Sequence, residues 1–180
     1  DNVESRLHKD KGIYGKVVAY SARDESSSKF GYTDLALLEL SPNEEQLAEI
    51  NKRGFSKIIS PVESENLKIG NKVTMIGCPT YTFYSFKCSI SGIASTTGTN
   101  SLSTDKSPVS GMSGGGLFKG RYLVGVTASQ NYPTYGGFAN PKSIYKLLDN
   151  FGYSNLYKLI LNTIINNYLL TVKDSKDFFM

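Results

Sequence analysis

Short runs of β-branched, aliphatic and aromatic residues alternate with turn residues from Val3 to about Thr127. The runs are bounded by Gly, Pro, Ser, Asp and Asn, which favour turns and loops. They predict strands at residues 15–22, 34–40, 56–62, 72–78, 86–95, 115–120 and 122–129, and loops at 96–107 and 131–137. Recurrent short strands of this kind are typical of a β-sandwich or a β-barrel.

Helical patterns interrupt the strands once and then dominate the C-terminal end. The segment from Ser41 to Gly54 has a serine that can cap a helix, Pro42 at the first helical position and a glycine that can end it. Apolar residues recur with helical spacing over 141–152, and a second amphipathic helix is predicted from about residue 155 to 170. The pattern therefore predicts an all-β region followed by helices.

Bulk properties exclude several function classes. The 180 residues suit one domain or two small subdomains around a shared cleft. The net charge is +4, but the Lys and Arg residues are scattered, so no nucleic-acid partner is predicted. The most apolar segment, 156–170, is too short and too rich in Asn to span a bilayer, so no membrane partner is predicted. The compartment is not indicated.

Two cysteines, Cys78 and Cys88, lie in a predicted hairpin with nine residues between them. They could pair across the strands or remain two free buried thiols, and the pattern leaves both alternatives open. The chain has no Cys-x-x-Cys pair and one histidine. A zinc site is therefore not expected, and no metal or other cofactor is predicted.

The segment SPVSGMSGGGLF, residues 107–118, places Ser113 among four glycines. It satisfies the Gly-x-Ser-x-Gly pattern of the α/β-hydrolases, which requires a helix after the serine and a histidine later in the chain. Here a predicted strand pair follows and no histidine does, so that fold is excluded. The alternative is a trypsin-type loop, with Ser113 as nucleophile and the amides of Gly111 and Ser113 as an oxyanion hole.

Asp34 stands directly before the apolar strand LALLEL. In a catalytic triad, a buried carboxylate orients the histidine and stabilises its cation, and the start of a buried strand suits that role. Asp34 and Ser113 are 79 positions apart (113 minus 34) and lie in opposite halves of the chain. This separation fits a cleft between two barrels.

Five stretches in order resemble chymotrypsin-fold serine proteases, and most of all the HtrA-type (high-temperature-requirement) protease domains. They are TDLALLEL, LKIGNKVTMIGCP with CSISGIAS, GMSGGGLF, YLVGVTAS and GGFANP. In the serine loop, Met112 stands where the family usually has Asn or Asp. The resemblance covers roughly residues 5–150 and leaves the tail from residue 153 unexplained.

The resemblance implies two antiparallel β-barrels with C-terminal helices. The expected parts are an N-terminal barrel half with Asp34 at 1–65, a C-terminal barrel with Ser113 at 66–140 and a helical extension at 141–180. The implied activity is cleavage of a peptide or protein substrate through acylation of Ser113. Ser107 would form the floor of the substrate pocket, with Thr127 and Ala128 on its wall. An uncharged floor favours an apolar or small residue before the cleaved bond.

The histidine that this mechanism needs is absent from its expected setting. His8 is the one histidine in the chain, and its surroundings resemble the hairpin that follows the catalytic histidine in the family. His8 is therefore either the base or, as its setting favours, an ordinary exposed strand residue. In the second case, either the base lies upstream of Asp1 or the protein is a pseudoprotease used as a binding or structural module.

The count of predicted strands also bears on the N-terminal half. Residues 1–65 hold about four strand candidates, fewer than a six-stranded barrel needs, and an open barrel would expose strand edges. We therefore expect an N-terminal fragment, a longer precursor or a partner to complete this barrel. The abrupt start at Asp1 also suggests a processing protease that cuts its own precursor.

Overall fold

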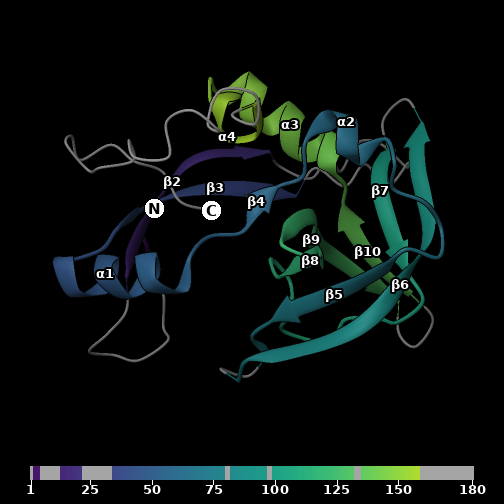
Figure 1. Ribbon diagram of the computed structural model, residues 1–180, viewed down its shortest axis with the longest axis horizontal. Coiled ribbons are helices and arrows are strands. Elements are labelled where there is room, and N and C mark those ends of the chain that lie inside the picture. Colours follow the sequence, from purple (N-terminus) through teal and green to yellow (C-terminus); the bar gives the residue numbers. More distant parts are fainter. Residues whose placement is uncertain are drawn as a thin grey trace.

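A computed structural model describes residues 2–4, 13–21, 34–79, 82–96, 99–131 and 135–158. These residues form a closed antiparallel barrel, a smaller three-stranded sheet and four helices (Figure 1). No helix in these ranges is both long enough and apolar enough to cross a membrane.

The barrel contains six antiparallel strands in the order β10–β7–β6–β5–β8–β9, and β9 pairs with β10 to close it. A seventh, two-residue strand, β4 (Lys57–Ile58), is added parallel to β9. The barrel strands are β5 (Lys72–Gly77), β6 (Tyr84–Thr96), β7 (Thr99–Thr104), β8 (Gly116–Lys119), β9 (Tyr122–Asn131) and β10 (Tyr135–Ala139). The prediction of a barrel in this half of the chain is confirmed.

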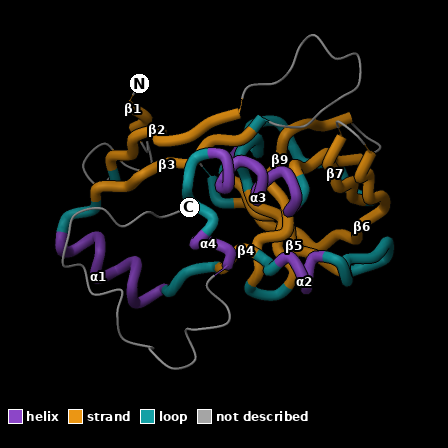
Figure 2. The backbone as a smooth tube through the Cα atoms, turned by 90° about the horizontal axis from the view of Figure 1, so that it is seen from above, coloured by secondary structure: helices purple, strands orange, loops and turns teal. Residues whose placement is uncertain are grey.

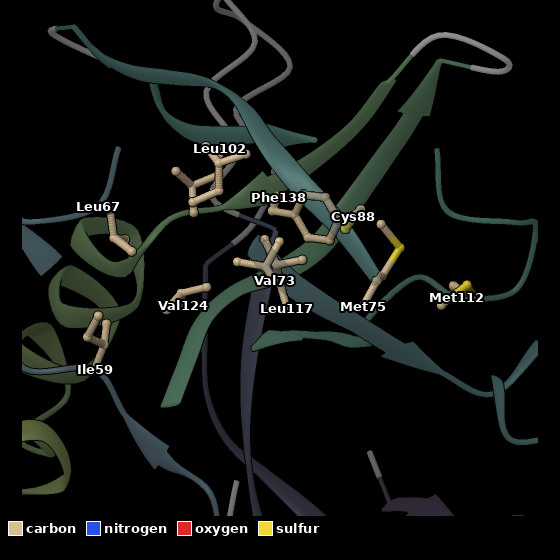
Figure 3. Packing of buried hydrophobic residues seen from close by; sticks show 11 residues of the cluster. Ile59, Leu67, Val73, Met75, Cys88, Leu102, Met112, Leu117, Val124 and Phe138 are labelled. Atoms are coloured by element: carbon tan, nitrogen blue, oxygen red, sulfur yellow. The ribbon is translucent and has the colours of Figure 1, made fainter. Parts of the chain in front are cut away.

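The barrel interior is filled by side chains from all around the ring. Met75, Leu117, Val124 and Phe138 are completely buried there. Figure 3 shows Met112 at one end of this cluster, with Ile59 and Leu67 at the other. The core therefore extends from the loop that carries Ser113 to the segment that leads into β5.

The second sheet consists of β1 (Asn2–Glu4), β2 (Tyr14–Ser21) and β3 (Leu35–Ser41), all antiparallel. Leu35 and Leu37 of β3 are buried in a second core cluster with Ala139 of β10 and Ile144 of helix α3 (Pro141–Asn150). Viewed from above, α3 lies over the junction of this sheet with the barrel (Figure 2). The prediction of a second β unit and C-terminal helices is confirmed, although its described part is a sheet and not a closed barrel.

Two tyrosine hydroxyls connect the C-terminal helices to the segment after β4 and to each other. The Tyr145 hydroxyl on α3 donates to the carbonyl oxygen of Ile59 over 2.6 Å, and the Tyr157 hydroxyl donates to Asp149 over 2.6 Å. The two tyrosine rings lie 4.4 Å apart. Tyr157 belongs to α4 (Asn155–Lys158), which is the described part of the helix predicted at 155–170.

Three sequence predictions are wrong in detail. Helix α1 (Glu44–Arg53) is capped by Asn43 and not by Ser41, because Asn43 and Gln46 form a reciprocal capping box. The predicted strand at 56–62 shortens to β4, and Ser60 caps helix α2 (Pro61–Ser64) in its place. The predicted loops at 96–107 and 131–137 contain β7 and the start of β10, because barrel closure pairs these polar and glycine-rich segments with each other.

The two cysteines do not pair. Cys78 is exposed, Cys88 is buried, and both are free. Cys88 lies opposite Val73, which is five residues before Cys78, or about 16 Å at strand rise. A disulfide needs Cα atoms within about 7 Å. Burial raises the pKa of the Cys88 thiol from 9.0 to about 11.

Candidate active site

Ser113 lies on the loop between β7 and β8, and its side chain is exposed. The residue before it, Met112, is only 1% exposed and belongs to the barrel core. The Met112 side chain lies against the backbone of Gly77 at the end of β5. Met112 therefore anchors the loop in the core and leaves Ser113 at the surface.

Hydrogen bonds fix the loop on both sides of Ser113. The amide of Met112 donates to the carbonyl of Val109 over 3.1 Å, and the amide of Gly115 donates to the carbonyl of Met112 over 2.9 Å. Thr127 on β9 makes two more bonds: its carbonyl accepts from Gly114 at 2.9 Å, and its amide donates to the Gly115 carbonyl at 2.8 Å. The nucleophile candidate thus sits on a backbone held by β9 and by its own turn.

The glycines of this loop serve two different purposes. Gly111 and Gly114 have φ angles of 90° and 80°, in the left-handed region that favours glycine. Gly115 lies so close to the barrel that a Cβ would collide with the Ile76 carbonyl and would lie 2.8 Å from the Met112 carbonyl. The loop therefore needs glycine for its turns and for contact with β5.

The amides of Gly111 and Ser113 are the predicted oxyanion donors. Neither donates a hydrogen bond to an acceptor in the ranges that the structure describes. Unpaired amides are what an oxyanion hole requires before a substrate binds. Their role stays a prediction.

Asp34 directly precedes β3 and is exposed, whereas a buried carboxylate was expected. No hydrogen bond or ion pair joins it to another described residue. Its neighbour Leu35 belongs to the second core cluster, against which Val126 of β9 packs. Val126 directly precedes Thr127, so the second core cluster and the Ser113 loop meet at adjacent residues of β9. His8 lies outside the described residues.

The predicted pocket residues gather around β9 and β10. Ser107 is half-buried, and its hydroxyl donates to the Pro108 carbonyl over 3.2 Å. Thr127 is 3% exposed, and its hydroxyl has no partner in the described ranges. Thr127 lies opposite Phe138 of β10, and Ala128 beside it is half-buried.

Gly136 of β10 was not singled out from the sequence. A Cβ at this position would lie 2.6 Å from Cδ of Pro108 and 3.0 Å from the Thr104 hydroxyl. The segment with Ser107 and Pro108 therefore lies directly over β10. The paired glycines in YGGFA were the available signal, because glycine inside a strand often marks a close approach of another backbone.

The part of the chain that the structure describes contains no group of three or more His, Cys, Asp or Glu side chains that could hold a metal ion.

No protein-family model and no curated protein matches this chain. Solved structures do match. The HtrA-type protease AlgW with a decapeptide has a TM-score of 0.58 at 16% identity, over 81% of this chain and 43% of that chain. The inactive form of the Rv3671c protease has a TM-score of 0.57 at 17% identity, over 80% of this chain and 69% of that one.

An inactive serine-to-alanine mutant of Rv3671c from M. tuberculosis H37Rv matches with a TM-score of 0.55 at 16% identity, over 80% of this chain and 67% of its own. This chain spans less than half the length of the AlgW chain. At these identities the likeness establishes the fold, which is the chymotrypsin-like fold of HtrA-type proteases.

Proposed function

We propose that this chain belongs to a serine endopeptidase whose nucleophile is Ser113. One observation carries the proposal: an exposed serine sits on a loop fixed by Met112 and Thr127, beside two amides that donate to no described acceptor. Since a fold alone does not determine activity, the proposal rests on this geometry together with the HtrA-type fold.

In the proposed reaction, the Ser113 hydroxyl attacks the carbonyl carbon of a peptide bond while a histidine takes its proton. The amides of Gly111 and Ser113 hold the oxyanion. The carbon–nitrogen bond then breaks, the histidine returns the proton to the leaving amine, and water hydrolyses the acyl ester. Asp34 would orient the histidine. Because the Asp34 carboxylate is exposed in this structure, the histidine would have to cover it.

A peptide or protein is the proposed substrate. The solved AlgW structure contains a decapeptide, which supports a peptide ligand in a fold of this kind. Ser107, Thr127 and Ala128 would line the pocket for the residue before the cleaved bond. Because none of the three is charged, that residue is proposed to be apolar or small.

The base is proposed to come either from His8 or from a further segment that completes the first barrel. Leu38 and Leu40 on β3 are half-buried and alternate with the buried Leu35 and Leu37, so both faces of the strand are apolar. Among the described residues, β3 pairs with β2 alone. Additional strands that pair with this edge and close the sheet into a barrel would bury the second face, and one of them would bring a histidine to Asp34.

A catalytically inactive homologue is the second candidate, and it is favoured by the exposed Asp34, which has no hydrogen-bond or ion-pair partner among the described residues. Labelling with a fluorophosphonate separates the two, because the reagent reacts with an activated serine. Labelling that disappears in Ser113→Ala would support the enzyme. No labelling of the protein in its native, full-length form would refute it and favour a binding module.

The same assay identifies the base. Loss of labelling in His8→Ala would assign the role to His8, whereas retained labelling would place the base on another segment. A self-processing protease would in addition release a new N-terminus in the wild-type precursor and none in its Ser113→Ala variant.

A further inference from the structure

Near the Ser113 loop, one end of the barrel carries an aromatic patch that has no part in the proposed catalytic mechanism or substrate pocket. We define the aromatic patch as Phe83, Tyr84 and Phe86. Phe83 is 69% exposed and Tyr84 is 45% exposed, while Phe86 packs against the barrel core. The rings of Tyr84 and Phe86 meet edge to face at 5.6 Å.

The patch continues the interior row of β6 beyond the barrel. Residues two apart on a strand share a face, so Tyr84 and Phe86 lie on the same face of β6 as the buried Cys88 and Ile90, which come after them. Lys106 lies over Phe86 at 6.0 Å from the ring centroid. Tyr84 is therefore the exposed end of this row, and the more exposed Phe83 directly precedes it in the chain.

Strand register connects the aromatic patch to the Ser113 loop. Tyr84 lies directly opposite Gly77, and the Cβ direction of Gly77 points at the Met112 side chain. Side chains opposite each other in an antiparallel pair share a face and are about 5 Å apart. Tyr84 and Met112 therefore lie on the same face of β5 and β6, and Met112 directly precedes Ser113.

We propose that the aromatic patch binds an aromatic or large aliphatic side chain of the peptide that reaches Ser113. Gly77 contacts Met112, the neighbour of Ser113, and pairs with Tyr84 about 5 Å away, so Ser113 and Tyr84 are roughly 10 Å apart. An extended peptide covers that distance in about three residues. The side chain would thus stand about three residues from the bond at Ser113. This inference rests on the proposed function in taking the Ser113 loop as a peptide site, but it does not require turnover.

The exposed faces of Phe83 and Tyr84 suit such an occupant. Rigid aromatic rings offer a large apolar contact area and lose little side-chain entropy on binding, and aromatic pairs prefer the edge-to-face geometry already present here. Continuity with the candidate nucleophile favours the substrate over an unrelated partner, because the same bound peptide would contact both.

Binding to the Ser113→Ala protein tests the proposal without turnover. The probes are fluorescein-labelled ten-residue peptides of alanine, serine and glutamine in which one phenylalanine is moved through every position, with a phenylalanine-free peptide as reference. We expect phenylalanine at one or two neighbouring positions to tighten binding about 10- to 30-fold by fluorescence anisotropy.

Matched variants show which residues cause the increase in affinity for phenylalanine-containing peptides. Phe83→Ser with Tyr84→Ser should abolish it, Tyr84→Phe should keep it, and Tyr14→Ser with Tyr20→Ser should keep it, since those tyrosines are 66% and 65% exposed on the other sheet. Circular dichroism checks that each variant is folded. No phenylalanine preference at any position, or equal losses in both double variants, would overturn the proposal.

Fluorophosphonate labelling of the wild-type protein keeps the two hypotheses apart. A labelled Ser113 without phenylalanine preference would refute the aromatic patch and leave the endopeptidase standing. A phenylalanine preference that disappears in Phe83→Ser with Tyr84→Ser, without labelling of the wild-type protein in its native, full-length form, would support the patch and refute the enzyme.

Discussion

Met112 packs against Gly77 so closely that a Cβ added to the glycine would lie 3.0 Å from Cε and Cγ of the methionine. This contact joins the Ser113 loop to the end of β5. It also accounts for a methionine where the resembling family usually has Asn or Asp, because the side chain enters an apolar core. The loop's position therefore depends on a hydrophobic contact.

Removal of this anchor should destabilise the protein. We expect Met112→Ala to lower the free energy of unfolding by about 2–5 kcal/mol, because a buried side chain is replaced by a cavity. Met112→Leu, which nearly conserves volume, should cost less than about 1.5 kcal/mol. Urea unfolding followed by circular dichroism measures both, and equal losses in the two variants would contradict an anchoring role.

The close approach of Gly115 to β5 leads to a second prediction. Gly115→Ala should lower the free energy of unfolding by about 1–3 kcal/mol, because its Cβ would press on the carbonyls of Ile76 and Met112. Gly120→Ala is the control: Gly120 has a φ of 61° but open space around it, so the expected loss is about 1 kcal/mol. Thermal unfolding compares the two variants. Gly115 has no positive φ, so a loss for Gly115→Ala no larger than that for Gly120→Ala would contradict crowding against β5.

The buried hydroxyl of Thr127 gives a third prediction, on stability alone. This hydroxyl has no partner in the described ranges, whereas the equally buried Thr104 hydroxyl donates to the Lys106 carbonyl over 2.7 Å. Thr127→Val should therefore be neutral or stabilise the fold by about 1 kcal/mol, and Thr104→Val should destabilise it by about 1–3 kcal/mol. Differential scanning calorimetry would show a lower Tm for Thr104→Val and an unchanged or higher Tm for Thr127→Val. A large loss for Thr127→Val would mean that its hydroxyl has a partner outside the described residues.

The sequence pattern predicts some strands of the barrel and misses others. The strands of the serine half were readable where apolar residues dominate, as in β5 and β9. Thr99–Thr104 was not, because Leu102 is the one aliphatic side chain in this run. The strand forms because β6 and β10 pair with it on either side, and such distant pairings leave no local signal.

In one segment, a local pattern that favours a strand is overridden by a helix cap. Ile58, Ile59 and Val62 favoured a strand, yet Ser60 and Glu63 form a capping box around Pro61 and start α2. At the site, the pattern around Ser113 indicated which residues matter. It did not indicate that Met112 is buried or that Asp34 is exposed, because both depend on how the two sheets pack.

The last prediction concerns the hydrogen bond from the Tyr145 hydroxyl on α3 to the Ile59 carbonyl. Burial raises the pKa of Tyr145 from 10.0 to about 12. An unfolded chain loses this proton near pH 10, while the folded protein keeps it to about pH 12. The folded state thus holds more protons between these values, so the free energy of unfolding must fall as pH rises from 10 to 12.

The Tyr145→Phe variant separates the ionisation of Tyr145 from all other causes of pH-dependent stability. At pH 7 the variant should be about 1–2 kcal/mol less stable, because the Ile59 carbonyl loses its hydrogen bond. Between pH 10 and 12, the wild type should lose stability faster than the variant, so the gap should narrow. Urea unfolding at several pH values measures it. A stability gap that stays constant up to pH 12 would show that Tyr145 ionises alike in the folded and unfolded states, which would contradict the prediction.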